Sequence, residues 1–205
     1  MPRPLKLVVG LGNPGPRYAR TRHNVGFRVA ERFAANHAIA LDREAFGGRF
    51  GAGAIAGDGP ALEVFVLTPL TFMNHSGDAV AEAVATLPVS DPSRDLLIVL
   101  DDVDLPFGRL RLRPAGGAGG HRGLADVISR IARQDVPRLR FGVGRSISGH
   151  DTSGHVLEGF SGDEESALTS LVARAAEAVA LALTDGVEAA MNRYNPDPAA
   201  PASGG

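Results

Sequence analysis

The chain has 205 residues, 44% of them apolar, a formal net charge of −2 and no cysteine. This length can bury one sizeable core, and the absence of cysteine excludes disulfides, a thiol nucleophile and thiolate metal ligands. The low net charge argues against a generic nucleic-acid-binding protein. No signal peptide and no segment of membrane-spanning length is expected, so we predict a cytoplasmic protein with no membrane contact.

Strand-like apolar runs and helical periodicity alternate along the chain. Strands are predicted at residues 5–11, 62–68, 96–100, 109–113 and 138–143, with a weaker one at 50–56. Helices are predicted at residues 24–37, 77–87, 123–133 and 163–185. This alternation indicates an α/β fold, a twisted mixed sheet with helices on both faces, in one domain over residues 1–195. Residues 196–205, rich in Pro, Ala, Ser and Gly, are predicted to be a disordered tail.

The segment of residues 10–26 carries the most information about function. Its glycines follow the first strand in the spacing of a dinucleotide-binding fingerprint, G-x-G-x-x-G. That motif needs a helix at its third glycine, Gly15, and Pro16 disfavours the helical conformation there. The more natural helix start is Asn24, whose amide can cap the first turn. We therefore expect a displayed functional loop that ends at His23, and a nicotinamide-dependent oxidoreductase becomes a poor interpretation.

Polar side chains follow three of the predicted strands, namely Asn13, His23, Asn74 and Asp101. Loops at the carboxyl ends of parallel strands meet in one crevice, so these side chains can share a site. A histidine supported by a carboxylate activates water near neutral pH, and amides suit a peptide, a ribose hydroxyl or an oxyanion. Each residue also has a structural interpretation: His23 as a surface residue, Asn13 as a turn residue and Asn74 as a helix cap.

Three further features stay open at this level. Asp101, Asp102 and Asp104 fit either a solvated edge or a divalent-metal cluster. The glycine-rich run 116–123 lacks the P-loop ending, and it fits either an anion site before a helix or a flexible connector. His150 and His155 flank an irregular segment, where a metal site is the less favoured interpretation.

Positive charge is strongly segregated. Residues 3–32 hold seven basic residues and one acid, and residues 109–145 hold nine arginines and two acids, whereas residues 33–108 hold three arginines and eleven acids. An arginine-rich genome would explain the residue type but not this clustering, which favours a basic face that meets phosphate. The predicted strand 109–113 alternates Arg with Leu, so one of its faces should be a row of cations.

Taken together, the motifs resemble those of the bacterial-type peptidyl-tRNA hydrolase family. The resemblance spans about residues 5–193 and rests on several motifs in order. These are Gly10-Leu11-Gly12-Asn13-Pro14-Gly15, Tyr18, Thr21-Arg22-His23-Asn24, Thr71-Phe72-Met73-Asn74, Asp101-Asp102-Val103-Asp104, Gly119-Gly120-His121 and Arg138-Leu139-Arg140-Phe141-Gly142.

The resemblance implies hydrolysis of the ester between a peptide and the 3′ ribose of tRNA by a monomer, without a metal or organic cofactor. It assigns His23 as the base that activates water, Asp101 as the carboxylate that keeps it basic, and Asn13 as the residue that selects N-blocked aminoacyl groups. It implies contacts with the tRNA 3′ end and the peptide for Tyr18, Phe72, Met73, Asn74 and His121, and with acceptor-stem phosphates for Arg113 and Arg140.

One position departs from the family pattern. The family usually has asparagine directly after the histidine of the Gly-Gly-His segment, and this chain has Arg122. The role of that asparagine therefore does not carry over. The donor fork of arginine suits a terminal phosphate, although its bulk could instead crowd the pocket. The alternative function is a non-hydrolytic RNA-binding relative, against which the retention of both His23 and Asp101 argues.

Overall fold

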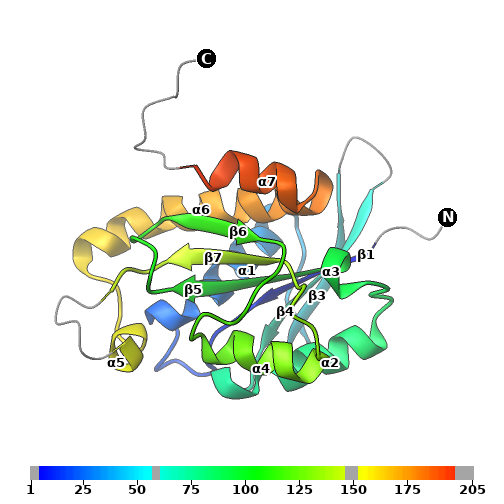
Figure 1. Cartoon of the computed structure of the whole chain (residues 1–205), viewed down its shortest axis with the longest axis horizontal. Coiled ribbons are helices and arrows are strands. Elements are labelled where there is room, and N and C mark those ends of the chain that lie inside the picture. Colours follow the sequence, from blue (N-terminus) through cyan, green and yellow to red (C-terminus); the bar gives the residue numbers. More distant parts are fainter. Residues whose placement is uncertain (1–4, 57–60, 146–151, 197–205) are drawn as a thin grey trace, which may run out of the picture.

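The computed structural model describes residues 5–56, 61–145 and 152–196. In these residues the strands form one seven-stranded sheet in the order β2-β3-β4-β1-β5-β7-β6 (Figure 1). The four central strands run parallel to one another: β1 (Leu5–Gly10), β4 (Leu62–Pro69), β5 (Leu96–Asp102) and β7 (Arg138–Gly142). Towards the edges, the pairing is antiparallel for β2 (Arg43–Ala45), β3 (Gly48–Ile55) and β6 (Leu110–Arg113).

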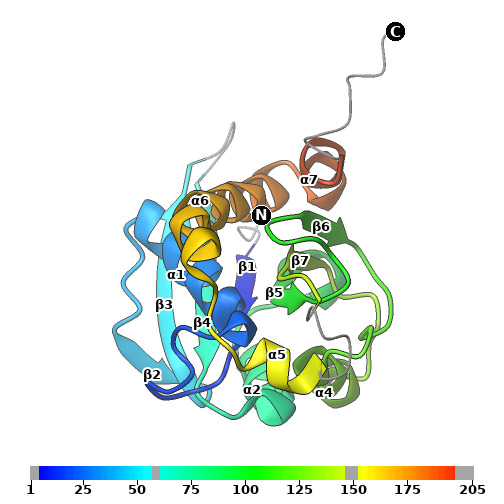
Figure 2. The same ribbon diagram turned by 90° about the vertical axis from the view of Figure 1, so that its left-hand side faces the viewer.

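Helices cover both faces of the sheet (Figures 1 and 2). One face carries α1 (Val25–Asn36), α6 (Gly162–Thr184) and α7 (Val187–Tyr194), and the other carries α2 (Ser76–Thr86) and α4 (Arg122–Ile131). Side chains alternate along a strand, so Val8 packs into the core with α1 and α6, whereas Leu7 and Val9 pack with α2 and α4. The predicted α/β architecture with a mixed sheet between helices is confirmed.

The elements that the sequence analysis missed are short. They are β2, α7, the connecting helices α3 (Pro92–Asp95) and α5 (Thr152–Val156), and the 3-10 helices η1 (Arg22–Asn24) and η2 (Met73–His75). Of these, α5 lies in a segment predicted to be irregular. A strand of three residues or a helix of four or five shows too few positions for a periodic pattern. Residues 197–205 of the predicted tail lie outside the described residues.

Helix α6 corrects the expectation that no segment reaches membrane-spanning length. Its 23 residues include a window with a mean hydropathy of 1.4, which is long and apolar enough for a membrane span by those criteria alone. In the structure 44% of that window is buried, and Leu168, Val172 and Val179 pack into the core beside α1. The high hydropathy of α6 comes from its alanine, valine and leucine residues, several of which pack into the core.

A close approach between β1 and α1 accounts for glycines of the 10–26 segment. A Cβ atom on Gly10 would lie 2.4 Å from the carbonyl oxygen of Gly26, so the helix can pack this closely only against a residue without a side chain. After Gly15 the chain forms turns rather than a helix, as Pro16 predicts, and α1 begins at Val25. Backbone packing therefore explains Gly10, whereas Gly15 adopts a φ of +94° that favours glycine.

Candidate active site

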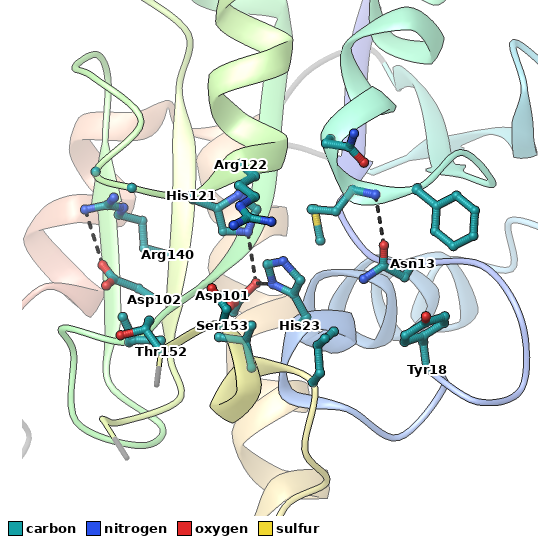
Figure 3. A pocket seen from close by; sticks show the side chains of 18 residues that line it. Asn13, Tyr18, His23, Asp101, Asp102, His121, Arg122, Arg140, Thr152 and Ser153 are labelled. Carbon is teal, nitrogen blue, oxygen red and sulfur yellow. Dashed lines mark hydrogen bonds and ion pairs between the residues drawn. The ribbon is translucent and has the colours of Figure 1, made fainter. Parts of the chain in front are cut away.

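The loops after the carboxyl ends of β1, β4 and β5 meet at one cavity of about 340 Å³ (Figure 3). The structure brings together almost all of the side chains predicted for the site, and Arg113 is the exception because it is not among the lining residues. The predicted residues that line the cavity are Asn13, Tyr18, His23, Phe72, Met73, Asn74, Asp101, His121, Arg122 and Arg140.

His23 and Asp101 form a hydrogen-bonded pair at the floor of this cavity. Nδ1 of His23 lies 2.7 Å from Oδ1 of Asp101, and the carboxylate is 3% exposed. Because a carboxylate only accepts, Nδ1 carries the proton and Nε2 keeps its lone pair. His23 lines the cavity, so this geometry suits it to take a proton from a water molecule there.

A second histidine donates to the same carboxylate oxygen. Nε2 of His121 lies 3.0 Å from Oδ1 of Asp101, and its Nδ1 accepts from the backbone N–H of Leu124 at 3.1 Å. Since Nδ1 accepts, the proton sits on Nε2 and points to Asp101. His121 thus caps α4 and holds Asp101 at once, a contact that the sequence analysis did not predict when it grouped His121 with the substrate contacts.

The two histidines keep Asp101 ionised. Burial raises the pKa of this carboxyl, but the electrostatic attraction of His121 and His23 and the hydrogen bonds from their rings outweigh burial and hold the pKa well below its usual range. Asp101 is therefore an anion at neutral pH. An anion in this position fixes the His23 tautomer and stabilises the imidazolium that forms when His23 accepts a proton.

The donor set of His23, Asp101 and His121 lies close enough for a metal ion but does not fit one. The three ligand atoms lie within 4.8 Å of one another. A metal would need the lone pair of Nε2 of His121, while Nδ1 of the same ring already accepts from Leu124. A neutral imidazole has one lone pair on nitrogen and one N–H, so it cannot accept at both positions. This hydrogen-bond pattern favours proton chemistry at the site.

Asn13 is held from both sides. Its backbone N–H donates to Oδ1 of Asn24 at 2.8 Å, and its carbonyl accepts from Nδ2 of Asn24 at 2.9 Å. The Asn13 side-chain oxygen accepts from the N–H of Met73 at 2.9 Å, which leaves its amide N–H groups for a ligand. The predicted capping role of Asn24 is wrong: Asn24 precedes α1, but its amide makes no capping hydrogen bond because Asn13 takes it.

Asn74 lies exposed on the rim of the cavity. His75, rather than Asn74, occupies the position before α2, and its side chain makes no capping hydrogen bond. The cap interpretation of Asn74 is therefore wrong, and among the described residues its amide has no hydrogen-bond partner, so it can meet a ligand.

Three of the seven basic residues in the first stretch bind to α6. Arg22 pairs with Glu164 at 2.6 Å, and both Arg28 and Arg20 pair with Glu165, at 2.9 and 3.4 Å. These acids belong to the first turn of α6, where negative charge is favourable. The expected phosphate-facing surface therefore does not include these three arginines.

The second stretch places four arginines on one face of β6 and β7, where Arg111 lies opposite Arg140 and Arg113 opposite Arg138. Like charges in direct opposition destabilise a sheet, so this arrangement needs compensation. Arg138 is buried and donates to the carbonyls of Gly116 and Gln134, while Arg140 pairs with Asp102 at 3.2 Å.

Burial and the neighbouring Arg140 lower the pKa of Arg138 to about 10, so it is still charged at neutral pH. In the described part of the chain, Arg138, Arg111 and Arg113 have no ion-pair partner. Excess positive charge therefore remains beside the cavity. Arg113 is exposed at the edge strand, and the predicted row of cations is confirmed for the outer face of this strand.

The three aspartates Asp101, Asp102 and Asp104 have different partners. Asp101 binds the two histidines, Asp102 pairs with Arg140, and Asp104 pairs with Arg145 at 2.8 Å. These carboxylates do not face a common point, which disfavours the divalent-metal interpretation. His155 bonds through Nε2 to the carbonyl of Gly144 at 3.0 Å and ties α5 to the end of β7, whereas His150 lies outside the described residues.

Several lining residues were missed by sequence reasoning. Helix α5 and the residue after it contribute Thr152, Ser153, Val156 and Leu157 to the cavity wall. No periodic or chemical pattern marked this five-residue helix in advance. The sequence analysis also did not predict that the Asn24 amide holds the backbone of Asn13 through two hydrogen bonds, which we call the Asn24 clamp.

The chain is similar to several known proteins. The family model described as "Peptidyl-tRNA hydrolase" matches residues 7–202. A peptidyl-tRNA hydrolase from Symbiobacterium thermophilum is 45% identical over 190 residues, which are 93% of this chain and 98% of that protein. One from Synechococcus sp. (strain JA-3-3Ab) is 47% identical over 193 residues, 94% of this chain and 83% of that protein. The crystal structure of peptidyl-tRNA hydrolase from Acinetobacter baumannii matches with a TM-score of 0.84 at 37% identity, covering 93% of this chain and 94% of its own.

Proposed function

The chain belongs to the peptidyl-tRNA hydrolase family, and we propose that its cavity hydrolyses the ester between a peptide and the 3′ ribose of tRNA, with His23 as general base. The observation that carries this proposal is the hydrogen bond from Nδ1 of His23 to the buried, ionised Asp101. It leaves Nε2 as a proton acceptor inside a cavity that collects the other predicted site residues except Arg113.

The reaction needs one water molecule and one proton relay. Nε2 of His23 removes a proton from water as the oxygen attacks the ester carbonyl, and Asp101 stabilises the imidazolium that results. When the tetrahedral intermediate collapses, the C–O bond to the ribose breaks and the imidazolium returns its proton to the leaving 3′ oxygen. The products are a peptide with a free carboxyl group and a tRNA with a free 3′ hydroxyl, and His23 is neutral again.

Asn13 supports selection of N-blocked substrates. Its oxygen is occupied by the N–H of Met73, so only its amide N–H groups can face the substrate. An N-blocked aminoacyl group offers a carbonyl oxygen that accepts from this amide. A free aminoacyl group offers an ammonium, which only donates and is mismatched. The fixed orientation of Asn13 thus supports cleavage of peptidyl-tRNA over aminoacyl-tRNA.

The tRNA end fits the open side of the cavity. Phe72 is 56% exposed and meets the ring of Tyr18 edge-on, with 6.4 Å between ring centroids. Exposed aromatic rings of this kind stack on unpaired bases. Arg113 and Arg140 supply positive charge for acceptor-stem phosphates, and Asn74 and Met73 would contact the terminal residue of the substrate. We further propose that the protein acts as a cytoplasmic monomer, without a metal or an organic cofactor.

The test is release of N-acetylphenylalanine from N-acetylphenylalanyl-tRNA by the purified protein, with free phenylalanyl-tRNA as the matched poor substrate. We expect turnover of the N-blocked ester in the presence of a metal chelator, and a loss of at least about 10²-fold in His23→Ala. Binding of tRNA without turnover by the wild type would favour the non-hydrolytic alternative, for which the comparisons give no support.

A further inference from the structure

We propose that Arg122 binds the phosphate on the 5′ side of the terminal nucleotide of the substrate and so adds an ionic contact next to the scissile ester. This inference rests on the proposed function. It starts from the place of Arg122, which follows His121 directly in the chain and lines the same cavity as His23. Figure 3 draws its side chain among those that line the cavity.

Of the two arginines that line the cavity, Arg140 has an internal partner and Arg122 has none among the described residues. Within the described residues it makes no ion pair and no side-chain hydrogen bond, and it is exposed. By contrast, Arg140 pairs with Asp102, Arg130 with Asp78 and Arg145 with Asp104. The donor fork of Arg122 is therefore available to a ligand, whereas that of Arg140 is already engaged by Asp102 and by the carbonyl of Ala118.

Arg122 makes no local interaction that would stabilise the start of α4. It is the first residue of α4, where the helix dipole favours negative charge, and the first turn of α4 contains no acid to offset the cation. The charge also adds to the positive potential of the β6 and β7 arginines. A cation that opposes the helix dipole and has no partner is best explained by an anion that arrives with the substrate.

The chemistry of the substrate places such an anion within reach. The ester bound over His23 is carried by the terminal ribose, and the nearest phosphate is attached to the 5′ position of that same ribose. Arginine matches a phosphate with two parallel N–H donors, which a shorter, neutral asparagine cannot do. We therefore infer a phosphate contact one nucleoside away from the reacting carbonyl.

The sharpest test uses two small substrates that differ by one phosphate: the N-acetylphenylalanyl esters of adenosine and of adenosine 5′-monophosphate. The readout is the ratio of their kcat/KM values. We expect the wild type to prefer the phosphorylated ester by about tenfold, as for a charge-assisted hydrogen-bonded contact. In Arg122→Gln this ratio should fall to about one, and in Arg122→Lys, which keeps the charge but not the fork, it should lie between.

The matched control is Arg130→Gln, on the same helix, which changes the net charge equally and should keep the wild-type ratio. An unchanged ratio in Arg122→Gln overturns the inference, and an equal rise in kcat/KM for both esters would show that Arg122 crowds the pocket instead. A wild type that fails to cleave N-acetylphenylalanyl-tRNA overturns the proposed function, whereas cleavage of that substrate without a phosphate preference overturns only this inference.

A second measurement decides the matter if the small esters react too slowly. Binding of tRNA to the His23→Ala protein is followed as a function of salt, with and without Arg122→Gln. Loss of one phosphate contact on single-stranded nucleic acid should reduce the slope of log K against log salt by about 0.7. An identical slope in the two proteins contradicts the contact.

Discussion

His23 and His121 donate hydrogen bonds to the same oxygen atom of Asp101, at 2.7 and 3.0 Å, and their rings lie 4.9 Å apart. The two histidines therefore share one carboxylate oxygen but have different roles. Nδ1 of His121 is fixed by the backbone of Leu124, so His121 can only donate to Asp101, while Nε2 of His23 stays available to the cavity. This pairing supports one histidine as the base and the other as the residue that positions its carboxylate.

The first prediction concerns the charge of Asp101. In Asp101→Asn the amide oxygen can still accept both N–H groups, so the geometry is kept while the negative charge is lost. We expect kcat for N-acetylphenylalanyl-tRNA to fall by about 10²-fold, because the imidazolium of His23 loses its stabilising anion. Single-turnover kinetics measure this step directly. A rate near that of the wild type, in a variant that unfolds at the wild-type temperature, would remove Asp101 from the mechanism.

The second prediction separates the two roles of His121, which caps α4 and positions Asp101. Asparagine is a good N-cap, so His121→Asn keeps the hydrogen bond to Leu124 and loses the one to Asp101, whereas His121→Ala loses both. We expect both variants to lose about tenfold in kcat. Only His121→Ala should also lose about 1 kcal/mol in the free energy of unfolding.

A pH profile distinguishes positioning from a purely structural role. Without His121 the pKa of Asp101 should rise, since His121 is the strongest of the influences that lower it. Because a carboxylate that has lost its second donor attracts the protonated ring of His23 more strongly, the acid side of the rate profile should move to higher pH in both variants. An unshifted profile would mean that His121 supports only the helix.

The sequence predicted the long elements and most of the site, for physical reasons that also explain its failures. Strands β1, β4 and β5 are predictable because their apolar runs are long, and the parallel arrangement brings Asn13, His23 and Asp101 to one edge. The link between His121 and Asp101 could not be predicted, because it depends on where the glycine-rich run folds back against β5.

Asn24 shows most clearly what sequence patterns cannot predict. An asparagine before a helix is equally suited to cap that helix or to bind the backbone of another segment, since both use the same amide. The choice depends on the position of residue 13 in space, where both backbone hydrogen bonds of Asn13 meet the Asn24 amide. Periodicity and propensity contain no information on that distance.

The third prediction concerns acid stability at the opposite end of β5. Asp95 is buried, and although burial raises its pKa, hydrogen bonds from Arg94, Asp91, Ser90 and Lys6 lower it from 3.8 to about 2. A carboxyl with a depressed pKa stabilises the fold above its unfolded pKa, and that contribution is lost as pH falls through the folded value. Between about pH 4 and pH 2, the fold should lose about 2 kcal/mol from this group.

Urea unfolding of the wild type and Asp95→Asn across this range measures the effect. The gap in unfolding free energy between the two proteins should be full at pH 5 and should shrink towards pH 2. A gap that stays constant with pH would show that Asp95 contributes through packing rather than through its charge.

The fourth prediction concerns the orientation of Asn13, which the Asn24 amide sets through two backbone hydrogen bonds. Asn24 is 2% exposed, so its loss leaves the backbone N–H and carbonyl of Asn13 without partners in a dry environment. In Asn24→Ala we expect the preference for N-acetylphenylalanyl-tRNA over phenylalanyl-tRNA to fall by about tenfold, as expected when a binding amide loses its alignment. The ratio of kcat/KM for the two substrates is the measurement.

Asn24→Asp makes this test specific to alignment. The aspartate keeps an acceptor for the Asn13 N–H and loses the donor to the Asn13 carbonyl, so its substrate preference should lie between those of the wild type and Asn24→Ala. Asn13→Ala removes the selecting amide itself and should abolish the preference that Asn24 supports. If Asn24→Ala instead lowers kcat/KM equally for both substrates, the clamp stabilises the loop without setting selectivity, and the role proposed for the Asn13 amide fails with it.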